Sequence, residues 1–100
     1  MSKYWGVVPR PFAEVSSVVD EVARSQRWTV APASTAHDRV YIKGMSAFSW
    51  GSSMTVQLRD EGELTRVSFD IHPTSLWGMW RARDIVNKFI VALGGVLEYS

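Results

Sequence analysis

The two histidines and the carboxylates beside them are the residues of this chain best suited to acid–base or metal chemistry. Asp70 and His72 stand two positions apart, and His37 directly precedes Asp38. Either pair could supply two metal ligands or an acid and a base, because imidazole titrates near neutral pH. A zinc site needs more ligands than that, and the chain has no cysteine and no HExxH pattern. We therefore predict no metal site and no cofactor.

Motifs for covalent catalysis and for phosphate binding are missing from the sequence. No GxSxG pattern places a serine on a nucleophile elbow. Gly44, Gly51 and Gly78 are isolated, so they form no glycine-rich phosphate loop. Residues 60–63 (Asp-Glu-Gly-Glu) are too few for an EF-hand loop and predict a turn. We predict no catalytic residue; an enzyme, which would need polar groups converging in a pocket, remains an alternative.

Tryptophan is unusually frequent, with five in 100 residues. Trp50 is expected to open a strand, and Trp77 and Trp80 to lie at the start of the last helix. Large apolar side chains would then gather at one end of the domain, namely Phe48, Trp50, Trp77, Met79 and Trp80. Such patches mark partner interfaces and ligand mouths, although tryptophans also close the open end of a small core. We predict ligand or partner contact at this end, with core closure as the alternative.

The composition limits the classes of protein to which the chain can belong. The chain is 46% hydrophobic and 21% charged, with a net charge of +1, which is typical of an ordinary globular domain. No apolar run reaches the ~18 residues that a membrane-spanning helix needs. We expect one domain over residues 1–95 with a tail at 96–100, not membrane-spanning and located in the cytoplasm.

Residues 52–71 carry the clearest structural pattern, two alternating strands around an acidic turn. The apolar positions fall on one face of each strand (Met54, Val56 and Leu58, then Thr65, Val67, Phe69 and Ile71), and polar residues fall on the other. Strict alternation around a glycine-containing turn predicts a hairpin with one buried and one wet face.

Two amphipathic helices and three further strands complete the predicted elements. Apolar residues recur at helical spacing from Phe12 to Ala23 and from Ala82 to Leu93. Residues 4–8, which end at a proline, predict an edge strand, and residues 28–33 predict a second strand. In residues 39–43 we expect Val40 and Ile42 to point inward, with Arg39, Tyr41 and Lys43 pointing outward.

The resulting order is β-α-β-β-β-β-α. We predict an α+β fold in which an antiparallel sheet of four to five strands carries two helices on one face. The expected core is Val56, Leu58, Val67, Phe69, Ile85 and Phe89. A ferredoxin-like fold, closed by a strand at residues 96–99, is the alternative.

This order, the helix that leads into Trp28-Thr29-Val30, and Phe48-Ser49-Trp50-Gly51 before alternating strands are similar to features of one group of proteins. The chain resembles small uncharacterised bacterial domains of TATA-binding-protein-like or helix-grip topology over nearly its whole length. The resemblance implies the fold and no activity. Helix-grip relatives commonly hold apolar ligands.

The outward face of the sheet is a second candidate surface. We expect Arg39, Tyr41, Lys43, Thr55, Gln57, Arg59, Arg66 and Ser68 to share it. This locally basic face allows nucleic-acid binding as an alternative, although nucleic-acid-binding domains carry a larger excess of Lys and Arg. A solvated face is the simpler interpretation. We predict a non-enzymatic binding or interaction module for a protein partner, a second copy of the chain or a small apolar ligand.

Overall fold

The described part of the chain forms strands and two helices, with four strands in succession between the helices. This computed structural model describes residues 2–43, 52–72 and 76–99, without the side chains of residues 2, 43, 52, 76–81 and 99. The elements are β1 (Ser2–Val8), α1 (Phe12–Ser25), β2 (Thr29–Val30), β3 (Asp38–Lys43), β4 (Ser52–Asp60), β5 (Thr65–His72), α2 (Leu76–Ala92) and β6 (Val96–Tyr99).

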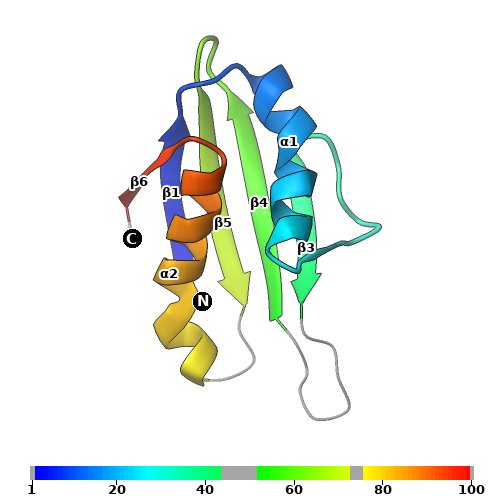
Figure 1. Cartoon of the computed structure of the whole chain (residues 1–100), viewed down its shortest axis with the longest axis vertical. Helices are drawn as coiled ribbons and strands as arrows, with labels where there is room; N and C mark the ends of the chain where they lie inside the picture. Colours follow the sequence, from blue (N-terminus) through cyan, green and yellow to red (C-terminus); the bar gives the residue numbers. More distant parts are fainter. Residues whose placement is uncertain (1, 44–51, 73–75, 100) are drawn as a thin grey trace.

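Six strands form one sheet in the order β2-β3-β4-β5-β1-β6, and every neighbouring pair is antiparallel. Both helices lie on the same face of this sheet, α1 over β3 and β4 and α2 over β1 and β5 (Figure 1). The predicted α+β class with an antiparallel sheet is therefore confirmed. Four strands separate the two helices, so the order differs from the β-α-β-β-α-β of a ferredoxin-like fold.

The hairpin of β4 and β5 forms as its alternation predicts. Burial along β5 alternates without a break, and the inward residues of β4 are buried opposite those of β5. The turn between the strands has Gly62 at a φ of +87°, a conformation that costs glycine little. The Asp60 carboxylate accepts a 3.0 Å hydrogen bond from the Gly62 amide, as is typical of Asx turns.

The core lies between this hairpin and the two helices. The predicted core is confirmed: five of its six members are buried, and Ile85 is partly buried against them. Phe89 of α2 sits at its centre, with its ring 5.7 Å from that of Phe69 and 5.9 Å from that of Tyr41. From α1, Val15, Val19 and Ala23 complete the cluster.

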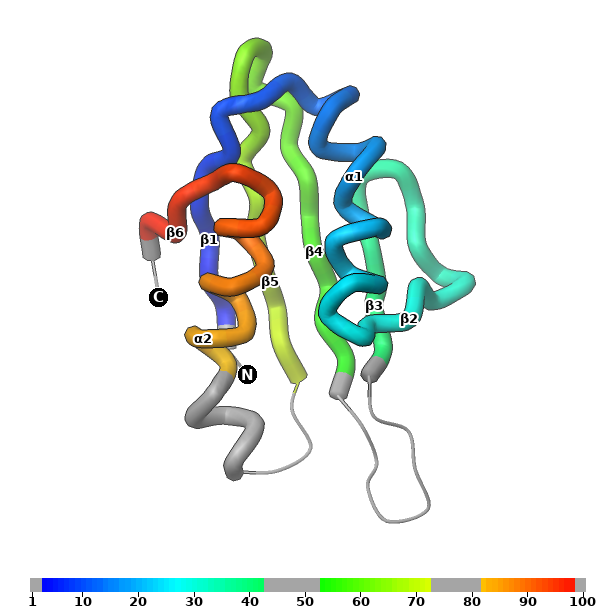
Figure 2. Tube along the Cα trace, viewed as in Figure 1, coloured from blue at the N-terminus to red at the C-terminus, as the bar shows by residue number. Residues whose placement is uncertain are grey.

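The strand β1 is an interior strand, and its prediction as an edge strand was wrong. It pairs with β5 along residues 2–8 and with β6 along residues 5–7, as Figure 2 shows. Pro9 costs no ladder hydrogen bond because it follows the last paired residue. The sheet has one strand more than the four or five expected, because residues 96–99 pair with β1. At the other edge, only Thr29 and Val30 of the strand expected at residues 28–33 are in the ladder.

Two glycines allow β1, β6 and α2 to approach one another closely. A Cβ on Gly6 would lie 2.3 Å from the Val96 carbonyl oxygen and 2.4 Å from Cδ1 of Ile90. A Cβ on Gly95 would lie 2.6 Å from the Val7 carbonyl oxygen. Larger side chains at either position would push the last strand away from the sheet.

The strand β3 faces the opposite way from the prediction. Tyr41 is fully buried opposite Met54, and Arg39 is opposite Val56, so both point toward the helices. Val40 and Ile42 are half-buried on the other face. The physical reason is a partner on α1: Nε and Nη2 of Arg39 donate to the two carboxylate oxygens of Asp20.

The Asp20 carboxylate binds Tyr41 as well as Arg39. The Tyr41 hydroxyl donates to Oδ1 of Asp20 at 2.7 Å, beside the 3.0 Å bond from Arg39 Nε. Buried polar groups cost free energy unless they are hydrogen-bonded, and here each side chain satisfies the others. The three residues fix α1 onto β3 at the rim of the core.

Replacing Phe69 by alanine should lower the free energy of unfolding by about 3–5 kcal/mol, because it opens a cavity at the centre of the core. Urea unfolding followed by circular dichroism would measure it. Val91→Ala is the control, since Val91 is 59% exposed and its loss should change stability by less than about 0.5 kcal/mol. Equal effects of the two changes would contradict the observed packing.

Replacing Tyr41 by phenylalanine should lower the free energy of unfolding by about 1–2 kcal/mol at neutral pH, because Asp20 loses one of its donors. Burial and the hydrogen bond to Asp20 raise the pKa of Tyr41 well above its ordinary value of 10. The unfolded chain therefore loses this proton first, and the stabilisation is complete below pH 10 and declines as pH rises further.

The Tyr41→Phe variant lacks that ionisation, so its stability should decline less steeply between about pH 10 and about pH 11. Urea titrations of both proteins across this range would compare the slopes. Parallel curves would show that Tyr41 is not coupled to folding in this way.

Candidate binding site on the open sheet face

The sheet face opposite the helices carries the candidate site, and we call it the open face. Period-two alternation and the strand pairing place the following residues on it: Lys3, Trp5, Val7, Val40, Ile42, Ser53, Thr55, Gln57, Arg59, Arg66, Ser68, Asp70, His72 and Val96. Neither helix covers this face (Figure 1). Its side chains are therefore open to a ligand while their strands are held in the sheet.

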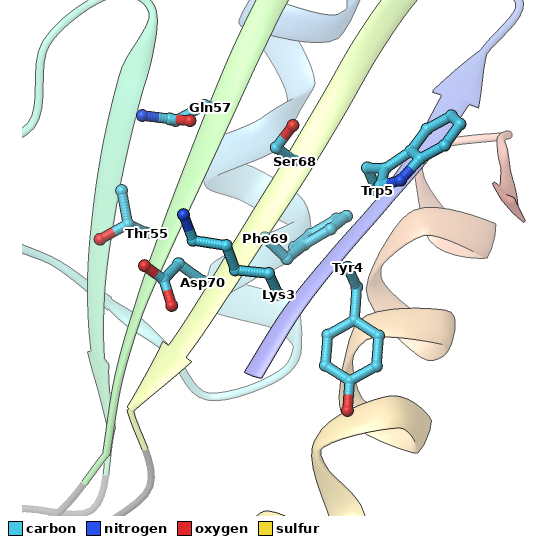
Figure 3. A pocket seen from close by; sticks show the side chains of 8 residues that line it. All are labelled: Lys3, Tyr4, Trp5, Thr55, Gln57, Ser68, Phe69 and Asp70. Atoms are coloured by element: carbon cyan, nitrogen blue, oxygen red, sulfur yellow. The ribbon is translucent and has the colours of Figure 1, made fainter. Parts of the chain in front are cut away.

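A hollow of about 250 Å³ lies near the middle of the open face, and we call it the Asp70 hollow. Its lining comes from three adjacent strands, β1, β5 and β4: Lys3, Tyr4, Trp5, Thr55, Gln57, Ser68, Phe69 and Asp70. Figure 3 shows the polar side chains and Trp5 around the hollow, while Tyr4 and Phe69 point away from it toward the helices. The side chains that a ligand would meet are therefore mostly polar.

The Asp70 carboxylate has one oxygen with no hydrogen-bond partner. Its Oδ1 atom is shielded from solvent and accepts no hydrogen bond in the structure. The nearest cation candidate is Nε2 of His72 at 3.5 Å, on a side chain that is 46% exposed. A buried acceptor left without a donor costs about 1–3 kcal/mol. The side chain is 29% exposed, so a donor from outside meets the carboxylate at its other oxygen.

Lys3 stands directly across from Asp70 in the ladder of β1 and β5. Cross-strand neighbours of opposite charge attract each other, yet the two side chains form no ion pair with one another in the structure. An exposed ammonium and a carboxylate thus lie side by side at the hollow, each with hydrogen-bonding capacity left over.

Trp5, which lines the hollow, is stacked against Arg66, which lies outside the lining. The Arg66 guanidinium lies over the Trp5 ring, 5.1 Å from its centroid, and its Nε donates to Glu61 at 2.8 Å. Contacts of this kind contribute about 0.5–1 kcal/mol at exposed sites. Trp5 is thereby held in a fixed orientation, with part of its surface accessible.

A second hollow of about 480 Å³ adjoins the first. The two share Gln57 and Ser68, and the second reaches His37, Asp38, Leu58, Arg59, Asp60 and Arg66. Arginines and aspartates alternate around it, so its charges largely cancel. Together the two hollows run obliquely across β4 and β5.

The predicted contact residues at the tryptophan-rich end are mostly beyond what the structure describes. Phe48 and Trp50 lie outside the described residues. The backbones of Trp77, Met79 and Trp80 belong to α2, but their side chains lie outside the described part. The contact predicted for these five residues therefore stays a prediction.

The predicted outward face is correct only in part. Arg39 and Tyr41 belong to the helix side, the side chain of Lys43 lies outside the described part, and Thr55, Gln57, Arg59, Arg66 and Ser68 lie on the open face as expected. Among the residues at the hollow, Lys3 and Trp5 were missed by sequence reasoning. The alternation of Trp5 and Val7 with Gly6 and Val8 was the available signal, but it is short and interrupted by glycine.

The geometry gives little support to a metal site or to an acid–base pair. Within the described ranges, no group of three or more His, Cys, Asp or Glu side chains is placed to hold a metal ion. Asp70 and His72 do approach each other, but His37 is stacked on Phe12 at 4.7 Å, well away along the sheet.

Comparison with known proteins leaves the family open. No protein-family model, curated protein or solved structure matches this chain. The resemblance to domains of TATA-binding-protein-like or helix-grip topology thus stays a prediction. Neither helix, over its described residues, is long and apolar enough to cross a membrane.

Zinc, nickel and manganese should leave the thermal unfolding midpoint unchanged, because Asp70 and His72 offer only two ligands. Melting curves with and without each metal, at two pH values, would test this. A saturable stabilisation that disappears below about pH 6 and in His72→Ala would contradict the prediction, since metal binding needs a deprotonated imidazole.

Proposed function

We propose that this protein is a non-catalytic binding module that recognises its ligand with the open face of the sheet. The observation that carries the proposal is the hollow on that face, at which the oppositely charged Lys3 and Asp70 are cross-strand neighbours but form no ion pair with each other. In addition, Oδ1 of Asp70 is shielded and accepts no hydrogen bond, which is uncommon for a buried polar atom and calls for an explanation.

The rigidity of the surface supports the same proposal. The hollow is built on three paired strands whose other face is packed against the helices, so its side chains keep their relative positions. Sites on regular elements lose little entropy when a ligand binds, which favours affinity. Trp5, already stacked under Arg66, adds a preorganised aromatic wall.

Catalysis is a weaker candidate for the same hollow. An acid–base mechanism needs a group whose proton affinity is matched to the reaction and a second group positioned beside it. The hollow offers one carboxylate, with His72 at 3.5 Å outside its lining. A small enzyme therefore remains the less favoured alternative.

Nucleic-acid binding loses support from the orientation of β3. Arg39 turns to Asp20 on the helix side, so the cations on the open face are Lys3, Arg59 and Arg66. Asp70 shares the face, and Asp38 and Asp60 line its second hollow. Without a strong positive potential, the counterion release that drives phosphate binding would be small.

The proposal predicts where small molecules bind. A library of water-soluble fragments, screened against the isotope-labelled protein, should shift the backbone amide signals of residues 3–7, 55–57 and 66–70. Fragments find hollows that combine apolar walls with a few polar groups. Fragments with an amine should dominate, because they can donate to Asp70.

The same titrations test whether the fragments bind to another surface of the protein instead. Asp70→Asn should weaken the amine fragments, whereas Asp84→Asn, the same change on an exposed position of α2, should not. Fragments that cluster around Trp50, Trp77 and Trp80, or on the helices, would contradict the proposal. A salt-sensitive shift with a single-stranded oligonucleotide instead would favour the nucleic-acid alternative.

A further inference from the structure

The Asp70 hollow holds one positive and one negative group side by side. Lys3 on β1 and Asp70 on β5 are direct cross-strand partners, and both line it. The Cβ atoms of such partners lie about 4.5–5.5 Å apart. A ligand seated between their ends meets an ammonium and a carboxylate at short separation.

The carboxylate of Asp70 makes one side of the hollow suited to a ligand group that donates strong hydrogen bonds. Oδ1 of Asp70 is shielded, but the side chain as a whole is 29% exposed, so a ligand can reach the carboxylate through its other oxygen. An ammonium group carries three donors on one atom and can satisfy such an acceptor from several directions. Hydrogen bonds between an ammonium and a carboxylate are among the strongest in proteins.

The positive side calls for an acceptor. The Lys3 side chain is exposed and forms no ion pair with Asp70 in the structure. Figure 3 shows it extended across β5 toward the hollow. A ligand cation bound at Asp70 is repelled by the nearby ammonium of Lys3. A ligand carboxylate placed at Lys3 would offset that repulsion.

The remaining lining matches a small ligand with a polar end and an apolar end. Thr55, Gln57 and Ser68 offer hydroxyl and amide groups on one side, and Trp5 offers an aromatic surface on the other. The volume of about 250 Å³ is below the ~300–1,000 Å³ of pockets for drug-sized ligands.

Building on the proposed function, we infer that the hollow binds a small zwitterion in which one carbon atom separates the ammonium from the carboxylate, as in a free α-amino acid. The ammonium donates to Asp70, and the carboxylate accepts from Lys3. The side chain of the ligand packs on Trp5. The neighbouring positive and negative groups of the protein thus favour a ligand whose own positive and negative groups are close together.

Leucine and two blocked forms of it test the charges separately. Leucine titrated into the labelled protein should give saturable shifts at the amides of Lys3, Ser68 and Asp70. N-acetyl-leucine lacks the ammonium and leucine amide lacks the carboxylate, so each should bind about tenfold or more weakly. Equal binding of all three would overturn the inference, as would binding of leucine amide alone.

Variants assign each charge to its residue. Asp70→Asn and Lys3→Gln should each weaken leucine binding about tenfold, while Asp84→Asn and Lys88→Gln on α2 should leave it unchanged. The spectra also show whether each variant stays folded. Leucine binding that survives both changes in the hollow would refute the assignment.

The fragment screen separates this inference from the proposed function. If fragments bind at the open face while leucine does not, the zwitterion inference fails and the open face remains the binding surface. If neither leucine nor fragments bind there, both fail.

Discussion

The two-residue repeat of the β4–β5 hairpin is the constraint on which this structure depends. It sends Met54, Val56, Val67 and Phe69 to one side and Thr55, Gln57, Ser68 and Asp70 to the other. The apolar side must be covered, and the two amphipathic helices cover it. Because they both lie on that side, the polar side is left as a broad, rigid surface. The division between a buried, stabilising face and an open, polar face follows from this alternation.

Regular periodicity, of two residues in the hairpin and of three to four in the helices, is also what made these elements and most of the core predictable. It failed at β3, where Val40 and Ile42 indicated the inward face. Arg39 and Tyr41 have long apolar portions that pack well at the rim of a core, provided that their polar ends find partners. That partner is Asp20, which lies about twenty positions earlier on α1. Local patterning carries no information about such a distant pair.

The candidate site likewise contains residues that local patterning could predict and residues that it could not. Thr55, Gln57, Ser68 and Asp70 could be assigned to the wet face because they lie within the alternating hairpin. Lys3 and Trp5 could not, because their place depends on β1 pairing with β5. Lys3 and Asp70, the oppositely charged neighbours at the hollow, are brought together by the topology of the sheet. Single-sequence patterns describe each strand well and their neighbours poorly.

The pairing of β1 with β5 and β6 also shapes the order in which the protein can be assembled during synthesis. Residues 2–8 are synthesised well before the strands beside them, residues 65–72 and 96–99. Until then β1 has no neighbour in the sheet, and α1 has only part of the surface that it covers. Contacts this distant in sequence slow folding and leave strand edges exposed meanwhile. This domain is therefore most vulnerable to aggregation before residues 65–99 have emerged from the ribosome, when chaperones would be most useful to it.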